Sequence, residues 1–503
     1  MFELSVALKY LTPRRRQLSV SIITLISILV ITLVVWLIVV FFSVTHGLEK
    51  SWIQKLVTLT APIRITPTED YYKSYYYQID GFSSESNYSL KTLEEKLSSS
   101  ILDPYSPEVD GELPAELQTA DLRHDGTLKD IVKQTFQQIQ SLPIKGIQAT
   151  DFEITIGNLR LNVVKNQQEP TSLSQTAYLG SFDSENSNLA LALLPLTEMD
   201  HRAIAVKEQL VNGKRTFHLP SDRHLGEGMI LPKNYKEAGA KVGDRGFLTY
   251  YLPTLSAVQE QRLPIYVAGF YDPGIIPSGK LVLVNKNVTS LIRASQDQNE
   301  TLASNGINVR FDDLDQTEAV KQGLIAAFEK EGLSRYWKIE SYREFEFAKD
   351  LIQQLHSERN LWTLIATVII IVACSNIISM LIILVNDKKQ EIGILRSMGA
   401  TSASIAFIFG FCGVMMGMIG SILGTALAAL TLRNLQTLLD WIGNMQGHQM
   451  FNPVFYGNSL PNQISSDALL FVVVATALIS LLAGIVPAVK ASLLRPSSIL
   501  RSE

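Results

Sequence analysis

Few residue patterns in this sequence could carry out catalysis or hold a metal ion. No GxxxxGK[ST] loop is present, so the chain offers no P-loop for ATP, and HExxH, CxxC and GxSxG are absent too. The closest pair among its seven histidines is His218 and His224, in a proline-containing loop without a nearby cysteine. A metal site there is one interpretation, but the missing ligands favour a solvated loop. We therefore expect no metal, no cofactor and no enzyme activity.

The most informative polar stretch is "NDKKQEIGILRSMGAT", residues 386–401, which lies between two strongly apolar segments. Asp387 with Gln390 predicts a helix start, and Gly399 predicts its end. The helix so bounded, Lys388 to Met398, would be about 16 Å long. One face carries Ile392, Leu395 and Gly399, with Ile394 and Met398 beside it and Lys388, Glu391 and Arg396 around it. Such a face suits docking into another protein; an ordinary surface helix is the alternative.

Four apolar windows predict membrane-spanning helices, at residues 19–46, 359–385, 403–432 and 468–490. Each exceeds the roughly 20 residues that cross a bilayer as a helix. Arg14, Arg15 and Arg16 precede the first window. Its apolar run is too long for a signal peptide and lacks a small-x-small cleavage site, so we interpret it as an uncleaved anchor.

Lysine and arginine in the short flanks predict the orientation of these spans. Basic residues gather before the first window, after the second and after the fourth, so both termini and the polar stretch are expected in the cytoplasm. The predicted organisation is then a cytoplasmic interfacial helix at 1–18, a periplasmic α+β domain with stalk helices at 47–358, a cytoplasmic helix at 386–402, a periplasmic loop at 433–467 and a cytoplasmic tail at 491–503. The net charge of −4 indicates no nucleic-acid partner. The expected fold class is a membrane protein with four transmembrane helices and a large domain inserted between the first two.

The third window carries a stripe of small residues at spacings of three and four: Gly410, Gly413, Gly417, Gly420 and Gly424. Such stripes let membrane helices approach closely, so we predict a packing face. Its partner could be another helix of this chain or a second subunit, and ordinary membrane glycine is the alternative. In the apolar run from Leu361 to Val385 the lone amide, Asn376, predicts an interhelical hydrogen bond. The window interiors hold no acidic or basic residue, which argues against an ion-coupled carrier.

The central block mixes both periodicities, as expected of an α+β domain. Strand-like runs include residues 61–68, 146–155, 245–253, 263–271 and 279–285, and helices are predicted at 88–100, 127–141 and 317–331. The run "DYYKSYYYQIDGF", residues 70–82, is interpreted as a strand and loop with half-buried tyrosines. An exposed contact surface is the alternative.

At the polar stretch the sequence resembles a known family. "NDKKQEIGILRSMGAT" after "ACSNIISMLIILV" is similar to the signature of four-helix ABC transporter permeases of the FtsX/MacB superfamily. The N-terminal "ALKYLTPRRRQLSVSIITLISILVITLVVWLIVVFFSVTHGLE" and the C-terminal "FYGNSLPNQISSDALLFVVVATALISLLAGIVPAVKASLLRPSSILR" resemble lipoprotein-releasing permeases of the LolC/LolE type. "EGMILPKNYKEAGAKVGDRGFLTYYLP" and "RLPIYVAGFYDPGI" resemble the outer-domain core of that type. Residues 71–142 match little of the family.

The resemblance implies a non-catalytic permease subunit in the bacterial inner membrane. Its expected partners are a dimeric cytoplasmic ABC ATPase, a second permease that is either a paralogue or another copy, lipoprotein cargo and a periplasmic chaperone. The resemblance assigns ATPase coupling to Asp387, Lys388, Glu391, Ile392, Leu395, Arg396, Gly399 and Ala400. It assigns chaperone binding to a hairpin at 253–264, with Pro253, Val258, Gln259, Arg262 and Pro264 as candidates.

A lipoprotein extractor must keep acyl chains out of water, because exposure costs about 0.8 kcal/mol per CH₂. Candidates for this shield, where the first two spans leave the membrane, are Trp36, Val40, Phe41, Val44, Leu361 and Ile365; plain lipid-facing or interhelical packing is the alternative. Two other functions remain open within the superfamily. They are a MacB-like efflux permease and an FtsX-like regulator of cell-envelope enzymes.

Overall fold

The computed structural model describes most of the chain. The described residues are 6–7, 18–115, 117, 119–122, 126–163, 171–211, 213–253, 257–274, 281–295, 304–447, 469–470, 472, 474–476 and 478. The chain divides into two compact units. One comprises Met1–Ser51 with Gln353–Glu503, and the other comprises Trp52–Ile352.

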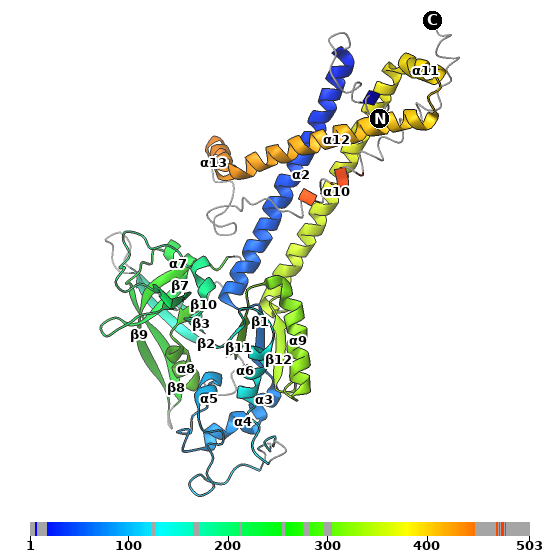
Figure 1. The fold of residues 1–503 in the computed structure, drawn as a ribbon. Helices are drawn as coiled ribbons and strands as arrows, with labels where there is room; N and C mark the ends of the chain where they lie inside the picture. The colour runs from blue at the N-terminus through cyan, green and yellow to red at the C-terminus, as the bar shows by residue number, and fades with distance from the viewer. Residues whose placement is uncertain are drawn as a thin grey trace. The chain divides into compact units, whose positions relative to one another are not determined.

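Three helices among the described residues are long and apolar enough to cross a membrane. They are α2 (Leu18–Leu59), α10 (Glu346–Asp387) and α12 (Ser402–Arg433), drawn blue, yellow-green and orange in Figure 1. Two short helices, α11 (Lys389–Ser397) and α13 (Leu435–Gln446), flank α12. The expected helical continuation of the first and second spans into the central block is confirmed, because α2 runs on to Leu59 and α10 starts at Glu346. The predicted fourth span, 468–490, lies largely outside the described residues.

The long helices of the first unit share one apolar core. Its members come from α2, α10, α11 and α12 and include Ile31, Val35, Ile370, Leu381, Leu384, Ile392, Ile405 and Phe409. The Ser27 hydroxyl donates a hydrogen bond to Asn376 Oδ1 at 3.4 Å, so α2 supplies a partner for this amide in the apolar part of α10. This confirms the predicted interhelical bond. Inside a bilayer such a bond satisfies a polar group that lipid cannot.

The second unit is built on a ten-stranded sheet. Its strands run in the order β12 (Trp337–Ser341), β1 (Ile63–Pro67), β11 (Ser304–Arg310), β2 (Gln148–Val163), β3 (Thr171–Ser181), β10 (Leu281–Val284), β7 (Gly226–Pro232), β9 (Val258–Tyr271) and β8 (Arg245–Pro253), with β6 (Ser221–Asp222) on β7. The β10–β3 and β7–β9 pairs are parallel and the other pairs antiparallel. A separate hairpin joins β4 (Lys207–Val211) to β5 (Lys214–His218).

Strand β2 closes part of this sheet into a barrel. One edge of β2 pairs with β3, while its other edge pairs first with β11, over residues 148–154, and then with β8, over residues 158–161. The strands β2, β3, β10, β7, β9 and β8 therefore form a closed ring. Along β2, buried Leu159, Leu161 and Val163 alternate with exposed residues and contribute to the barrel core. Helix α8 (Lys286–Ser295) packs against β2, β3 and β8.

The remaining strands, β12, β1 and β11, form a helix-covered lobe together with the start of β2. Its core joins buried side chains of β1 and β11 to helices α6 (Ile131–Ser141) and α9 (Thr317–Lys330). The helix predicted at 88–100 is shorter, as α5 (Leu93–Ser98), because a capping box between Thr92 and Glu95 fixes its start. The helix predicted at 127–141 starts at Ile131, where the Asp130 carboxylate accepts the Lys133 N–H.

The strand predicted within residues 70–82 is wrong. This run forms α3 (Glu69–Lys73), α4 (Tyr75–Gln78) and the 3₁₀ turn η1 (Ile79–Phe82). Tyr71 and Tyr76 are buried, and the Tyr71 ring lies 5.0 Å from that of Trp337. Packing of these rings into the lobe core overrides the strand preference of aromatic residues.

Candidate functional site

Helix α11 begins directly where α10 ends, so the predicted capping role of Asp387 is wrong. Asp387 is the last residue of α10, and Lys388 takes the N-cap position of α11 without a side-chain cap bond. The Lys388 N–H donates to the Leu384 carbonyl, which continues the α10 hydrogen-bond ladder into the junction. The Lys388 ammonium is almost fully buried and lies 2.7 Å from Glu391 Oε1. One residue therefore separates a long helix from a short one.

The end of α11 is fixed by Gly399, as predicted. Gly399 has a φ angle of 98°, a left-handed backbone conformation that residues other than glycine rarely adopt. The Gly399 N–H donates to the Arg396 carbonyl and the Ala400 N–H to the Leu395 carbonyl, the two bonds of a Schellman motif. Thr401 then caps α12 by accepting the Ser404 N–H at 3.1 Å. Hydrogen bonds at the end of α11 and at the start of α12 therefore fix the turn between the two helices.

The apolar face of α11 is divided between the core and the surface. Ile392, 1% exposed, packs into the core of the first unit with residues of α10 and α12. Leu395 is half-buried, and Arg396 donates to the Ser402 hydroxyl at 3.2 Å. Ile394 and Met398, 51% and 77% exposed, stand one turn apart. The exposed apolar surface of α11 therefore consists of Ile394 and Met398. Ile392, which the sequence predicted on that surface, instead holds α11 against the core.

The glycine stripe of α12 meets α2 at its C-terminal half. A Cβ added at Gly420 would lie 2.6 Å from Ile31 Cγ2, and one at Gly424 would lie 2.7 Å from the Thr32 carbonyl oxygen. Gly413 and Gly417 are buried, whereas a Cβ at Gly410 would meet nothing within 4 Å. A helix of the same chain, α2, therefore packs against Gly420 and Gly424, whereas the space beside Gly410 is open.

The six shield candidates lie on α2 and α10 but in different surroundings. The Trp36 indole N–H donates to the Thr431 hydroxyl of α12 at 2.9 Å. The Phe41 ring lies 4.1 Å from the ring of Trp362, centroid to centroid. Val40, Val44 and Ile365 are half-buried, and Leu361 is exposed. Trp36 and Phe41 thus pack between helices, and Leu361 faces outward.

The hairpin candidates lie on β8 and β9. The two strands pair from Arg245 with Tyr266 to Pro253 with Val258, which encloses the predicted hairpin. Gln259, Arg262 and Pro264 are exposed, and Arg262 Nε lies 3.0 Å from Glu260 Oε1. Val258 is 67% exposed at the tip end of β9. The hairpin thus presents an apolar side chain and a charged pair near its tip.

His218 and His224 are not part of a metal-binding group among the residues that the structure describes. His218 ends β5 and His224 follows β6, where its N–H donates to Asp222 Oδ1 at 2.8 Å. Within the described ranges, no group of three or more histidine, cysteine, aspartate or glutamate residues could hold a metal ion.

Sequence reasoning missed several residues of these sites. Trp362 and Thr431 lie in windows interpreted as uniform apolar spans, and their partners, Phe41 and Trp36 of α2, are distant in sequence. Their signal was weak but present, because an indole and a hydroxyl in a span favour interhelical contacts. The α2 residues facing the glycine stripe, Ile31, Thr32 and Val35, carry no comparable signal.

Part of the first unit matches a known protein family. Residues 363–495 match the family described as FtsX-like permease C-terminal, and this match contains α11, α12 and most of the membrane segment of α10. The chain therefore carries an FtsX-like permease domain in its C-terminal quarter.

Three relatives show the extent of the likeness. The Lipoprotein-releasing system transmembrane protein LolE of Haemophilus influenzae is 37% identical over 140 residues, 27% of this chain and 34% of that protein. LolC of the same organism is 34% identical over 154 residues, 31% and 36% of the two chains. LolC of Xylella fastidiosa is 24% identical over 199 residues, 39% and 46% of the two. The chain spans about a third to a half of the length of these relatives, and its resemblance to the LolC/LolE type is confirmed.

Proposed function

We propose that this chain is the permease subunit of an ATP-driven transporter that releases lipoproteins from the inner membrane toward a periplasmic chaperone. The observation that carries the proposal is the FtsX-like match at 363–495, which contains a short helix with an exposed apolar pair between two candidate spans. The likeness to proteins named for lipoprotein release supports the cargo. No nucleotide-binding loop exists in the sequence, which supports a separate ATPase.

In this proposal α11 receives the motion of a cytoplasmic ATPase dimer. Ile394 and Met398 insert into an apolar groove of the ATPase, within a rim formed by Lys389 and Arg396. Ile392 transmits the push, because its buried side chain joins α11 to the ends of α10 and α12. The turn at Gly399 holds the end of α11, so a push on α11 moves the whole helix and does not unwind it.

The cargo path lies along α2 and α10 of one permease and the matching helices of a second. Two or three acyl chains exposed to water would cost tens of kcal/mol at about 0.8 kcal/mol per CH₂, so they must move between apolar surfaces. Leu361, with half-buried Val40, Val44 and Ile365, supplies such a surface. The β8–β9 hairpin offers Val258 and the Arg262–Glu260 pair to the chaperone.

The proposed orientation has both termini and α11 in the cytoplasm of a bacterium and residues 47–358 in the periplasm. It follows the lysine and arginine bias of the flanks. Cysteine labelling from each side of the membrane, at Ser397 and at Leu210, tests it directly. Labelling of both positions from the same side would contradict it.

The central experiment is purification of the chain from its native membranes in mild detergent, followed by reconstitution with the proteins recovered. The proposal expects an ATPase, a second permease and acylated proteins, and ATP-dependent transfer of those proteins to a soluble chaperone. Recovery of an outer-membrane efflux partner would support the MacB-like alternative. Recovery of a cell-wall hydrolase with no transfer would support the FtsX-like one.

A further inference from the structure

The second unit contains a cavity of about 400 Å³, lined by residues between Tyr75 and Gln137. It lies between the turn η1, the segment that follows α5, and the first half of α6. Its apolar wall includes Ile79, Leu102 and Ile131. Charged and polar side chains make up most of the rest of its lining. A cavity of this volume has the dimensions of a small-molecule site, about 300–1,000 Å³.

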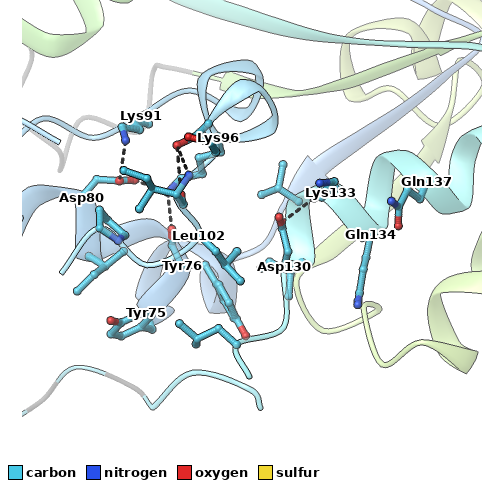
Figure 2. Close-up of a pocket in the computed structure, with 18 residues that line it drawn as sticks. Tyr75, Tyr76, Asp80, Lys91, Lys96, Leu102, Asp130, Lys133, Gln134 and Gln137 are labelled. Carbon is cyan, nitrogen blue, oxygen red and sulfur yellow. Dashed lines mark hydrogen bonds and ion pairs between the residues drawn. The ribbon is translucent and has the colours of Figure 1, made fainter. Parts of the chain in front are cut away.

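One wall of the cavity carries two ammonium groups on a single carboxylate. Asp80, only 2% exposed, forms ion pairs with both Lys96 and Lys91, the latter at 4.0 Å. Asp80 Oδ1 also accepts the Ser86 hydroxyl at 2.8 Å. Figure 2 shows Lys91 and Lys96 grouped around Asp80 on one side of the cavity. The cluster therefore keeps one positive charge in excess in a partly buried place.

The repulsion within this cluster affects the pKa of Lys96. Burial lowers the pKa of Lys96, the Asp80 carboxylate and, less strongly, the Asp130 carboxylate oppose that effect, and the neighbouring Lys91 lowers the pKa further. A bound anion would relieve this repulsion, and it would be held more strongly than in water because the surroundings are of low dielectric.

The opposite wall, at the start of α6, adds a second carboxylate, Asp130, and a further cation, Lys133. The Asp130 carboxylate is occupied as the helix cap, accepting the Lys133 N–H at 2.9 Å. The Lys133 ammonium has no ion-pair partner among the described residues, and Gln134 Oε1 is buried without a hydrogen-bond donor among them. Figure 2 shows Asp130, Lys133 and Gln134 together on this side.

We propose that this cavity binds a small organic carboxylate that has an apolar body. The carboxylate pairs with Lys91 beside the Asp80–Lys96 pair, and the apolar body covers Leu102 and Ile101. Leu102 and Ile101, both more than two-fifths exposed at the cavity, are the apolar surface that such a body would bury. This site goes beyond the proposed transport function and does not depend on it.

The test uses the full chain in lipid nanodiscs and N-acetyl-L-leucine as the probe, with binding measured by titration calorimetry and saturation-transfer NMR. N-acetyl-L-leucinamide is the matched probe without the charge. We expect saturable one-to-one binding of the acid and about tenfold weaker binding of the amide, as for loss of one charge-assisted hydrogen bond.

The variant Lys91→Gln should weaken binding of the acid about tenfold and leave binding of the amide unchanged. Lys73→Gln is the control, because Lys73 is an exposed lysine of the same lobe paired with Glu69. It should bind the acid as the parent chain does. Absence of saturable binding, equal binding of acid and amide by the parent chain, or undiminished binding by the folded Lys91→Gln variant would each overturn the proposal.

Discussion

The indole N–H of Trp36 donates a hydrogen bond to the Thr431 hydroxyl, and this bond joins α2 to the last turn of α12. Eleven positions earlier on α12, Gly420 meets Ile31 of α2. The two helices are therefore fixed to each other at two levels, one by a polar bond and one by close backbone approach. A permease that transmits motion through these helices needs their mutual contact to persist.

Removing either partner of the Trp36–Thr431 bond should weaken the α2–α12 contact. The variants Trp36→Phe and Thr431→Val, with the double variant, form a double-mutant cycle. We expect a coupling free energy of about 0.6 kcal/mol, the average for interhelical hydrogen bonds in membranes. Reversible unfolding of the chain in mixed micelles measures it. Strictly additive effects would show that the bond contributes nothing.

Enlarging the small residues of the α12 stripe should matter only where α2 lies against them. Gly424→Val places a Cβ 2.7 Å from a backbone oxygen of α2, which has no side-chain freedom to move away. We expect destabilisation of about 1–3 kcal/mol, typical of overpacking, seen as a lower thermal midpoint. Gly410→Val is the control, because a Cβ there meets nothing within 4 Å. Equal midpoints for the two variants would argue against the packing assignment.

A charge on the exposed face of α11 should uncouple ATP hydrolysis from release without unfolding the chain. Ile394→Asp removes an exposed apolar side chain and leaves the buried anchor Ile392 in place. We expect ATPase association to weaken at least tenfold and cargo release to fall in proportion, measured with the reconstituted complex. Ser397→Asp adds the same charge at an exposed polar residue of the same helix without removing an apolar side chain, and should keep both. A loss of the same size in both variants would assign the effect to charge alone.

The tip of the β8–β9 hairpin should be specific for the chaperone. Val258→Ser removes its exposed apolar side chain, and we expect chaperone affinity to fall severalfold while ATPase association is retained. Leu210→Ser on the β4–β5 hairpin removes a side chain of similar exposure, 73%, and should change neither. Surface plasmon resonance with the immobilised permease compares them. Chaperone affinity unchanged by Val258→Ser would remove this residue from the site.

Asp200 should give the second unit a stability that depends on acid pH. Burial raises the pKa of Asp200, but hydrogen bonds from the Thr197 hydroxyl and N–H and from the Val242 N–H outweigh it, so the net pKa lies below the ordinary 3.8. A lowered carboxylate pKa adds stability above the ordinary pKa, and this stability is lost as pH falls through the lowered value.

The variant Asp200→Ala should therefore be less stable than the parent by about 1–3 kcal/mol at pH 7, the cost of leaving buried donors unpaired. The difference should shrink below about pH 3.8, as the parent protonates. Denaturant unfolding at several pH values measures it, with the exposed neighbour Glu198→Ala as the control. A difference that is constant with pH would exclude the carboxylate as its source.

The sequence predicted the elements that repeat a simple period and missed those that depend on distant partners. The strands at 245–253 and the helix at 317–331 follow from alternation and from a 3.6-residue repeat, and both are observed within one residue. The tyrosine run was mistaken for a strand because its rings pack on Trp337, some 260 residues away. Asp387 and Gln390 predicted the start of a separate helix. Because α10 continues through Asp387, this residue is helical and does not cap α11.

For the candidate site, side-chain type predicted which residues gather but not which way they face. Ile392, Leu395, Ile394 and Met398 were all expected on one apolar surface of α11. The ends of α10 and α12 determine that Ile392 is buried and that Ile394 and Met398 are exposed. Likewise, the spacing of Gly420 and Gly424 predicted a packing face, and only the fold identifies α2 as its partner.

Strand β2 contacts two hydrophobic cores at once, with Ala149 packed against the lobe core near one end and Leu159 and Leu161 inside the ring. Peeling β11 or β8 away from it would expose backbone groups on the same continuous strand. Amide protons of β2 should consequently exchange with solvent only when both lobes open, which makes the second unit melt as a single cooperative block instead of two independent pieces.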